Sequence, residues 1–409
     1  MLVIKKFGGS SLATHELIFK VAHHIKNEYK NNKKIIMVLS AQGNTTDDLI
    51  ARALEINKNP PKRELDALLS TGEMQSVAFM SLALNSLSIP SISLNSYQID
   101  ILGDNNYCNA KILNINPSRI LNELDKNNVV IITGFQSKNC FGDILTLGRG
   151  GSDTSAVAIA VALKANSCEI FTDVDGIYTA DPKIIKNAKK INKINFDEML
   201  ELSSLGAVVM HNRAIELAKK YNIDIIVRSS FDYESDGTEI TNLNLEKNNI
   251  NIDMEKTLVS GIAVDKKIAM ISLIGIEDET GMTFKLFSIL ARNKISIDLL
   301  IQSMGRHSTK DMSFTVNLQN FKEAIKILEL NQDFLRYDHL IYREDVAKIS
   351  VIGSGIASNP EIGLKIFEAL YNQNISIKMI STSEIKISLL VSKSNSEIAA
   401  QEIHKNLIN

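Results

Sequence analysis

A glycine-rich turn that leads directly into an apolar helix is the feature that most restricts how this chain can fold. Residues 146–163 read TLGRGGSDTSAVAIAVAL, and the glycines of the turn are Gly148, Gly150 and Gly151. Glycine has no Cβ, so its backbone N–H group can approach an anion closely. We expect Ser152 or Asp153 to cap a helix that is apolar on every face and therefore buried, with its positive end towards the turn. A turn with a purely structural role is the alternative.

Two charged side chains in this turn point to an anionic ligand. Arg149 carries a planar guanidinium that suits a carboxylate or a phosphate. Asp153 lies among anion donors and needs a cation partner, which a lysine or a metal ion would supply. The sequence therefore predicts an anion site at the start of the helix.

The composition is that of an ordinary globular protein. The 409 residues, 44% of them hydrophobic, are enough for two or three domains with their own cores. The 45 basic and 47 acidic residues form no long single-sign block, so we expect no nucleic-acid partner. No apolar stretch approaches ~20 residues and the chain opens on a strand-like run, so we expect a cytoplasmic protein with no membrane contact. The widely spaced Cys108, Cys140 and Cys168 indicate packing residues rather than a disulfide framework or a zinc site.

Short apolar runs alternate with helical patterns over the first ~245 residues, which is typical of an α/β sheet with mostly parallel strands. The predicted strands are residues 2–7, 34–40, 89–94, 129–135, 169–172 and 223–229. The predicted helices are residues 14–30, 46–54, 65–87, 117–126 and 213–221. Ligands of such sheets bind beyond the carboxyl ends of the strands, so the loops there are candidate sites.

The loops after the first two strands carry residues suited to phosphate chemistry. Lys6 can neutralise a phosphoryl group in transit while the amides of Gly8 and Gly9 hold its oxygens. A solvated lysine before a tight turn is the alternative. In the second loop, the hydroxyl groups of Ser40 and Thr46 can cap the next helix or bind a ligand.

Acidic residues occur in two further stretches. Glu73 would suit an ammonium group, and a solvated helix-end glutamate is the alternative. Asp173, Asp175 and Asp181 share one loop and can hold Mg²⁺ through oxygens or water, or clasp the ribose of a nucleotide. The sequence contains no P-loop lysine motif and no kinase-type catalytic loop, so a nucleotide would be bound in another way.

Three motifs resemble those of a known family. KFGGSS, TLGRGGSDTSA and TDVDGIYTADPK occur in this order and at this spacing in the aspartate kinases of the amino-acid kinase superfamily, and the resemblance covers nearly the whole chain. It implies a three-layer α/β sandwich with a mostly parallel sheet. It also implies that ATP, with Mg²⁺, phosphorylates the β-carboxylate of L-aspartate, the entry step to lysine, threonine and methionine synthesis.

The resemblance also implies roles for individual residues. Lys6 would stabilise the moving phosphoryl group and Asp153 would orient the lysines, while Arg149 and Glu73 would bind the α-carboxylate and the ammonium group of the substrate. The implied substrate-binding residues are Ser40, Thr46, Glu73, Arg149, Gly150, Gly151 and Ser152. The implied nucleotide-binding residues are Lys6, Gly8, Gly9, Thr172, Asp173, Ile177, Tyr178, Asp181, Pro182 and Lys183. No residue is assigned as a direct metal ligand.

One position departs from the family pattern. Many aspartate kinases carry a lysine, which helps to neutralise the leaving group, where this chain has Val208. We expect Lys183, Mg²⁺ or the glycine amides to compensate. The alternatives are a kinase of another small amino-acid carboxylate, such as glutamate, and a weakly active or non-catalytic amino-acid sensor, which Val208 alone supports.

The last third of the chain contains an internal repeat. Residues 295–297 read ISI and recur at residues 375–377. Each copy is expected to run strand, helix, strand and a further strand. This order resembles paired ACT domains, which bind amino acids between neighbouring copies. A homo-oligomer interface formed by the sheet edges is the alternative, and the two roles are compatible. The predicted domains are a kinase domain at 1–245, a polar linker at 246–260 and ACT-like domains at 261–340 and 341–409.

The repeat contains residues that resemble the family's effector contacts. They are Asp278, Gly281, Asp298, Gln302, Ser383 and Glu384. A helix N-terminus beside them suits an effector carboxylate, and an aspartate suits its ammonium group. We expect lysine, threonine or both as the effector. In the second copy the usual glycine is displaced to Gly363, so the first copy is the better candidate.

Overall fold

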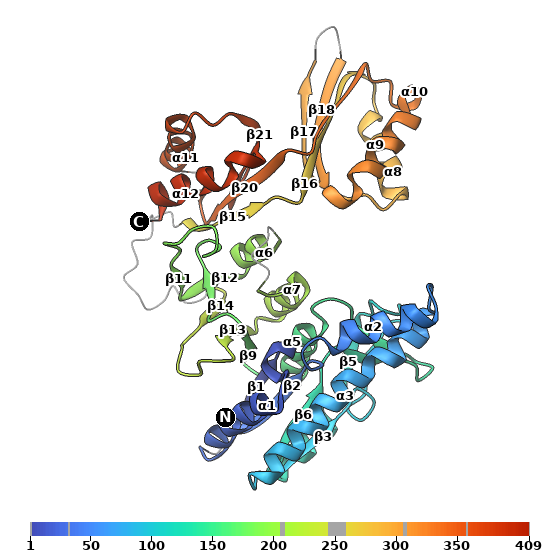
Figure 1. Ribbon diagram of the computed structural model, residues 1–409, viewed down its shortest axis with the longest axis vertical. Helices are drawn as coiled ribbons and strands as arrows, with labels where there is room; N and C mark the ends of the chain where they lie inside the picture. Colours follow the sequence, from blue (N-terminus) through green and yellow to red (C-terminus); the bar gives the residue numbers. More distant parts are fainter. Residues whose placement is uncertain are drawn as a thin grey trace. The chain divides into compact units, whose positions relative to one another are not determined.

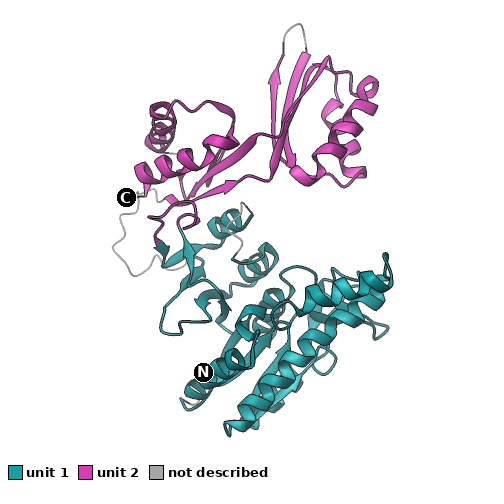
Figure 2. Cartoon of the chain, viewed as in Figure 1, with its two compact units in different colours: residues 1–178, 190–204, 208–252 teal, residues 179–189, 205–207, 253–409 magenta. Residues whose placement is uncertain are grey.

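The computed structural model describes residues 2–31, 33–204, 209–243, 259–305, 309–356 and 359–408. The chain divides into two units (Figure 2). The first contains residues 1–178, 190–204 and 208–252, and the second contains residues 179–189, 205–207 and 253–409. Val208 and residues 246–258 of the predicted linker lie outside the described residues.

An eight-stranded sheet organises the first unit (Figure 1). Its order is β12 (Lys193–Asn195), β14 (Thr238–Thr241), β13 (Asp224–Ser229), β9 (Ser167–Thr172), β1 (Leu2–Phe7), β2 (Lys34–Leu39), β6 (Val129–Thr133) and β3 (Ser91–Leu94). Neighbouring strands are parallel except β13 and β14, which pair antiparallel. Every predicted strand of the kinase domain lies in this sheet, which confirms the mostly parallel α/β fold. Central strands such as β2 and β6 are almost wholly apolar because both of their faces are covered.

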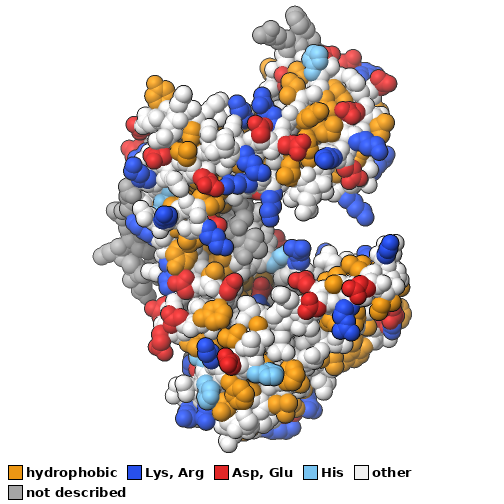
Figure 3. Space-filling model, viewed as in Figure 1, with side chains coloured by type: hydrophobic (Ala, Val, Ile, Leu, Met, Phe, Trp, Pro, Cys, Tyr) orange, Lys and Arg blue, Asp and Glu red, His pale blue; other side chains and the backbone are white. Residues whose placement is uncertain are grey.

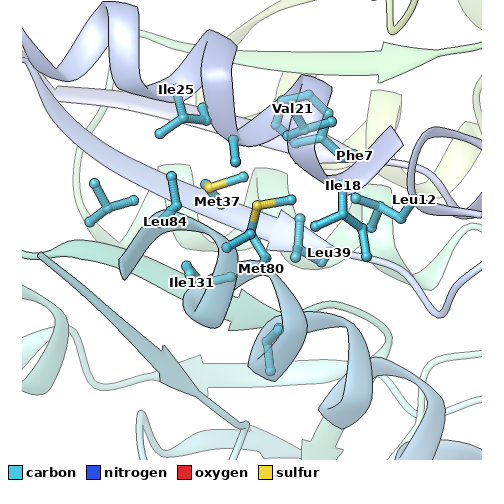
Figure 4. Packing of buried hydrophobic residues seen from close by; sticks show 14 of the residues in the cluster. Phe7, Leu12, Ile18, Val21, Ile25, Met37, Leu39, Met80, Leu84 and Ile131 are labelled. Carbon is cyan, nitrogen blue, oxygen red and sulfur yellow. The ribbon is translucent and has the colours of Figure 1, made fainter. Parts of the chain in front are cut away.

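Helices cover both faces of the sheet and make a three-layer sandwich. On one face, α1 (His15–Tyr29) and α3 (Lys62–Ser86) pack with Phe7, Met37 and other strand residues in a buried cluster (Figure 4). On the other face lie α5 (Gly151–Ala162) and α7 (Asn212–Tyr221). Successive side chains of β1 alternate between these layers, because a strand has a period of two. The remaining helices are η1 (Gly9–Leu12), α2 (Thr45–Ile56), α4 (Ser118–Asp125) and α6 (Phe196–Ser204).

Two small sheets complete the first unit, and the sequence did not predict them. One has the order β5 (Ile112–Ile115), β4 (Ile101–Gly103), β7 (Gln136–Lys138) and β8 (Ile144–Thr146). The other pairs β10 (Ile177–Tyr178) with β11 (Lys190–Ile191). Strands this short show too little alternation to be recognised from the sequence.

The helix after the glycine turn is buried as predicted, but it is capped differently. Its N-cap is Gly150, which is left-handed with a φ of 66°, and no side chain caps the helix. The predicted cap by Ser152 or Asp153 is therefore wrong. Both residues already lie in the first turn, because glycine directs the chain into the helix at Gly151. The N–H of Gly151 donates a hydrogen bond of 3.0 Å to the carbonyl oxygen of Gly148, so the N–H groups of Ser152 and Asp153 are the ones in this first turn that can bind a ligand.

The cysteines follow the packing prediction only in part. Cys168 on β9 is buried, Cys108 is half-buried and Cys140 is exposed, and all three are free thiols. Only Cys168 is thus a packing residue of the core.

The surface agrees with the near-neutral charge. Acidic and basic side chains are intermixed on the face that Figure 3 shows. Among the residues that the structure describes, no helix combines the length and the apolar character needed to cross a bilayer.

The second unit contains two antiparallel sheets of four strands each. One has the order β15 (Val259–Asp265), β20 (Val346–Gly353), β22 (Lys386–Ser392) and β21 (Ile377–Ser383). The other has the order β17 (Ile297–Met304), β18 (Thr309–Asn317), β16 (Ile268–Glu277) and β19 (His339–Arg343). The helices are α8 (Met282–Arg292), α9 (Phe321–Leu330), α10 (Gln332–Leu335), α11 (Pro360–Asn372) and α12 (Ser396–Leu407).

The two sheets confirm the internal repeat. The first copy runs β16, α8, β17, β18 and α9, and the second runs β20, α11, β21, β22 and α12. Each copy has its own buried cluster, and each ends in a helix that the sequence analysis did not predict. Strand β15 precedes the first copy in the chain but adds an edge to the sheet of the second, so the copies are interleaved.

Candidate active site

A cavity of about 790 Å³ opens in the first unit, where the ends of β1 and β2 meet the glycine turn. It is lined by every residue that was predicted to be catalytic or substrate-binding: Lys6, Ser40, Thr46, Glu73, Arg149, Gly150, Gly151, Ser152 and Asp153. These residues come from two strand ends, three helices and a turn that are far apart in the sequence. The fold therefore gathers chemically matched groups in one place.

Lys6 and Asp153 form an ion pair with an N–O distance of 2.7 Å. Lys6 points from β1 to the α5 face of the sheet, and Asp153 lies in the first turn of α5. Each side chain is only 12% exposed. Of the two cations considered for Asp153, the structure thus supplies a lysine, and the pair holds the ammonium group at the wall of the cavity.

Glu73 is buried on α3, and its two carboxylate oxygens differ in their contacts. Its Oε1 accepts a hydrogen bond of 3.2 Å from the N–H of Ala41, while Oε2 has no hydrogen-bond partner among the residues that the structure describes. Burial raises the pKa of Glu73 to about 7. No ion pair reaches it from the residues that the structure describes. An ammonium group of a ligand would satisfy Oε2 and favour the charged carboxylate.

The glycine turn is held in a conformation that other residues would resist. Gly148 and Gly150 both have positive φ, of 75° and 66°. A Cβ on Gly150 would lie 2.1 Å from the Cβ of His211 on the neighbouring loop. Arg149, between these glycines, is exposed, and no carboxylate in the described ranges lies within ion-pair distance of it. Its guanidinium is available for a ligand carboxylate.

The predicted nucleotide-binding residues lie in several places. Lys6 and Gly9 line the cavity, and Gly8 connects β1 to β9 through a hydrogen bond of 3.3 Å to the carbonyl oxygen of Phe171. The remaining members in the first unit are Thr172, Asp173, Ile177 and Tyr178, on β9, the loop after it and β10. The Tyr178 hydroxyl donates a hydrogen bond of 3.0 Å to Asp175.

The last three predicted nucleotide residues, Asp181, Pro182 and Lys183, belong to the second unit. There the backbone N–H of Lys183 donates a hydrogen bond of 2.9 Å to the Asp181 carboxylate. Lys183 also lines a cavity of about 670 Å³ together with residues of α12.

Comparisons with known proteins place the chain in a family. Residues 1–229 match the amino acid kinase family, and residues 349–407 match an ACT domain. An aspartokinase of Thermus thermophilus is 42% identical over 99% of this chain and 98% of its own length. An aspartokinase of Corynebacterium glutamicum is 39% identical over 99% of this chain and 95% of its own length. The chain belongs to the aspartokinase family. It is accordingly an ATP-dependent kinase with ACT regulatory domains, as the three motifs and the internal repeat indicated.

Solved structures agree with this assignment. The aspartate kinase of Synechocystis is 37% identical, with a TM-score of 0.56, over 100% of this chain and 69% of that one. Escherichia coli aspartokinase III, solved in complex with aspartate and ADP, has a TM-score of 0.79 at 23% identity and covers 100% of both chains. This second similarity shows that the fold is shared.

The predicted effector residues of the first ACT copy already have partners within the second unit. Asp278 pairs with Lys310, and Asp298 pairs with Lys348 of the other sheet. Gln302 accepts a hydrogen bond of 3.1 Å from Thr283. Gly281 caps α8 with a φ of 96° and open space around its Cα, so a ligand can approach this helix end. In the second copy, Ser383 and Glu384 are exposed at the end of β21.

Sequence reasoning missed several residues that line the cavity. Leu65 and Leu69 precede Glu73 at intervals of four, which places them on one face of α3, and this periodicity was a usable signal. Cys108 and Phe135 come from loops, and both have positive φ, of 65° and 66°. No sequence pattern marks a left-handed cysteine or phenylalanine.

Proposed function

We propose that the chain transfers the γ-phosphoryl group of ATP to the β-carboxylate of L-aspartate and forms 4-phospho-L-aspartate. This is the first step of lysine, threonine and methionine biosynthesis. One observation carries the substrate assignment: a single cavity holds a buried Glu73 oxygen and the Arg149 guanidinium, both without a partner in the described part of the chain, together with the Lys6–Asp153 ion pair. An amino acid with a second carboxylate offers an ammonium group, an α-carboxylate and a phosphoryl acceptor to match them.

In the proposed reaction the substrate is held at both of its α-groups. Glu73 binds the ammonium group and Arg149 binds the α-carboxylate, with Ser40, Thr46, Gly150, Gly151 and Ser152 around them. The β-carboxylate oxygen then attacks the γ-phosphorus. An O–P bond forms, the bond between the γ-phosphorus and the bridging oxygen breaks, and the electron pair leaves with ADP.

Lys6 neutralises charge on the phosphoryl group as it moves, and the amides of Gly8 and Gly9 hold its oxygens. Asp153 keeps the Lys6 ammonium group in place, since Nζ of Lys6 lies 2.7 Å from Oδ1 of Asp153. A preorganised cation of this kind needs little rearrangement when charge develops, which is why it can accelerate the transfer.

The nucleotide is proposed to lie at Thr172, Asp173, Ile177, Tyr178, Asp181, Pro182 and Lys183. The described residues contain no group of three or more His, Cys, Asp or Glu side chains that could hold a metal ion. Mg²⁺ does not need such a group, because it commonly keeps several waters and binds through phosphates and one or two carboxylates. It therefore fits the proposed nucleotide site. When bound with ATP, Mg²⁺ would neutralise phosphate charge. We propose that Mg²⁺, Lys183 and the glycine amides together neutralise the charge of the leaving group, which Val208 cannot do.

Regulation and assembly are part of the same proposal. The ACT pair, within the predicted domains 261–340 and 341–409, would bind lysine, threonine or both and would assemble a homo-oligomer. The proposed location is the cytoplasm, with no nucleic-acid or membrane partner. The partly exposed effector residues and the accessible N-terminus of α8 support a ligand site on the first copy.

An ADP-release assay on the full chain tests the proposed substrate. Aspartate should be phosphorylated at least tenfold more efficiently, in kcat/KM, than N-acetylglutamate, because the cavity pairs an ammonium site with an α-carboxylate site, and the comparison with glutamate decides the side-chain length. N-acetylglutamate lacks a free ammonium group and serves as the control for Glu73. Preference for glutamate would change the substrate, and ADP release with none of the three would make the chain a regulatory paralogue.

A further inference from the structure

Asp66 of α3 is a fully buried carboxylate that lies just outside the lining of the cavity. One of its oxygens accepts a hydrogen bond of 2.5 Å from the Thr146 hydroxyl, and the other accepts one of 2.9 Å from the backbone N–H of Cys108. Within the described part of the chain it has no ion-pair partner. Asp66 therefore joins two segments that are remote in sequence.

Arg213 of α7 holds the same two segments from another side. Its Nη1 donates a hydrogen bond of 2.7 Å to the carbonyl oxygen of Leu147, and its Nη2 donates one of 2.5 Å to that of Ala110. Desolvation lowers the pKa of its guanidinium. No carboxylate among the described residues lies within ion-pair distance. The planar fork is thus used on two neutral acceptors.

The held segments carry the glycine turn. The N–H of Ala110 donates a hydrogen bond of 3.0 Å to the carbonyl oxygen of Thr146, so the segments also pair with each other. Gly148 follows directly, and a Cβ there would lie 3.1 Å from the carbonyl oxygen of Cys108. Arg149 is the next residue. Any shift of this pair of segments therefore moves the turn and the start of α5 together.

The chemistry of the two residues argues against a role in packing alone. Asp66 is a buried charge and Arg213 a half-buried one, and neither has an ionic partner among the described residues. Such a charge is unfavourable, and neutral side chains of similar volume would fill the same space at less cost. Hydrogen bonds to charged groups are shorter and stronger than neutral ones. Such bonds suit a position that must be held closely, because misplacing a substrate group by about 1 Å can lower the rate by about 10²-fold.

We propose that Asp66 and Arg213 are positioning residues that clamp residues 108–110 against 146–147 and so fix the glycine turn for the carboxylate of the amino-acid substrate. The clamp rests on the proposed function of Arg149 as the carboxylate ligand. Neither clamp residue touches the substrate. The clamp therefore affects the binding of the amino acid more than the binding of ATP.

The test compares Arg213→Lys, Asp66→Asn and the surface control Arg119→Lys in the full chain. Lysine keeps the charge of Arg213 but lacks the planar fork, and asparagine keeps only one of the two acceptors of Asp66. We expect the KM for aspartate to rise about tenfold or more in both clamp variants, with the KM for ATP within about twofold of the parent. Arg119 of α4 is exposed and pairs with the buried Glu123, and its lysine variant keeps the charge and should behave as the parent. In Arg213→Ala, guanidinium ion should lower the KM for aspartate towards that of the parent and leave the KM for ATP unchanged.

Two results would overturn the clamp. The first is an unchanged KM for aspartate in both variants while Arg149→Ala raises it. The second is an equal rise in the KM values for aspartate and ATP that scales with the fall in melting temperature. If Arg149→Ala itself leaves the KM for aspartate unchanged, the proposed function fails instead. Asp66→Asn keeps the test decisive if an Arg213 variant does not fold.

Discussion

Asp298 of β17 and Lys348 of β20 form an ion pair that joins the two ACT sheets. The Lys348 side chain is 3% exposed, whereas Asp298 is 45% exposed. The carboxylate that was predicted to bind an effector is therefore already occupied by a buried ammonium group. An effector with an ammonium group at Asp298 must compete with Lys348, and this competition links effector binding to the contact between the sheets.

We expect lysine, threonine or both together to inhibit the enzyme, and Asp298→Ala to abolish that inhibition while unregulated activity is retained. Coupling between effector and active site should be about 1–3 kcal/mol, or roughly 5- to 150-fold in apparent affinity. Lys348→Met is the matched variant. It frees Asp298, so inhibition should persist and occur at lower effector concentration.

Stability separates the two roles of Asp298. Asp298→Ala leaves Lys348 buried without this partner and should lower the free energy of unfolding and the melting temperature. The loss of free energy should be less than the ~3–5 kcal/mol of a fully buried pair, because Asp298 is 45% exposed. Adding Lys348→Met should restore stability without restoring inhibition. Inhibition that survives in Asp298→Ala would remove this residue from the effector site. Activity that neither amino acid affects at millimolar levels would leave the ACT pair as an assembly module.

A second prediction contrasts two adjacent lysines on opposite faces of β1. Lys6→Ala should lower kcat by roughly 10²-fold or more with the fold unchanged, because the charge on the moving phosphoryl group loses its cation. Lys5 is buried against Glu28, at 2.9 Å, and Glu169. Lys5→Met should leave kcat near that of the parent but lower stability by about 3 kcal/mol. Measured kcat values and urea midpoints of both variants decide, and a near-normal kcat for Lys6→Ala would exclude it from the mechanism.

The sequence predicted most of the cavity because Lys6, Ser40 and the glycine turn sit at strand ends and at a helix start, where local pattern and chemistry agree, whereas Glu73 lies inside α3 rather than at a helix end. Lys6, Glu73 and Asp153 could each be identified from their own neighbours. The clamp could not, since Asp66 and Arg213 act on backbone and hydroxyl groups far away in the chain. A buried charge on a helix looks like a solvated one until the fold is known.

In the second unit the repeat was predicted, but its interleaving was not. Strand β15 joins the sheet of the second copy, and this depends on tertiary pairing rather than on the sequence of β15. The partners of Asp278 and Asp298 are likewise lysines on other strands, which no local pattern reveals. The capping error at α5 arose because the left-handed Gly150 took the place that a polar side chain usually fills.

A third prediction follows from Glu73. Burial raises its pKa to about 7, and only the charged carboxylate attracts an ammonium group. The KM for aspartate should therefore rise as the pH falls below 7, by up to about tenfold for each pH unit. In Glu73→Gln the KM should be high and nearly independent of pH between 5 and 7. Initial rates at varied aspartate and saturating ATP provide the measurement, and the same pH dependence in both proteins would assign the titration to another group.

The last prediction concerns His24 and the stability of the first unit. Burial, and next the charge of Lys5, lower the pKa of His24 to about 4. Its ring stacks on Tyr233, with centroids 4.0 Å apart, and Nε2 lies 4.0 Å from Glu28. Phe171 packs against its edge, and Glu169 and Arg228 are the other charges that act on it. The folded state thus holds a neutral imidazole.

The difference in proton binding between folded and unfolded His24 sets how the free energy of unfolding changes with pH. Between pH 6.5 and about 4, unfolded His24 is protonated and folded His24 is not, so the free energy of unfolding falls as the pH falls through this window. We expect a loss of at most about 3 kcal/mol. Glu73, with its raised pKa, acts in the opposite direction between pH 4.5 and 7, so the parent alone is not diagnostic. The measurement is the urea midpoint at pH 7 and pH 5 in the parent and in His24→Phe, which keeps the stacking and cannot titrate. The pH-dependent loss should shrink in the variant, and an equal loss in both would show that His24 is not the group responsible.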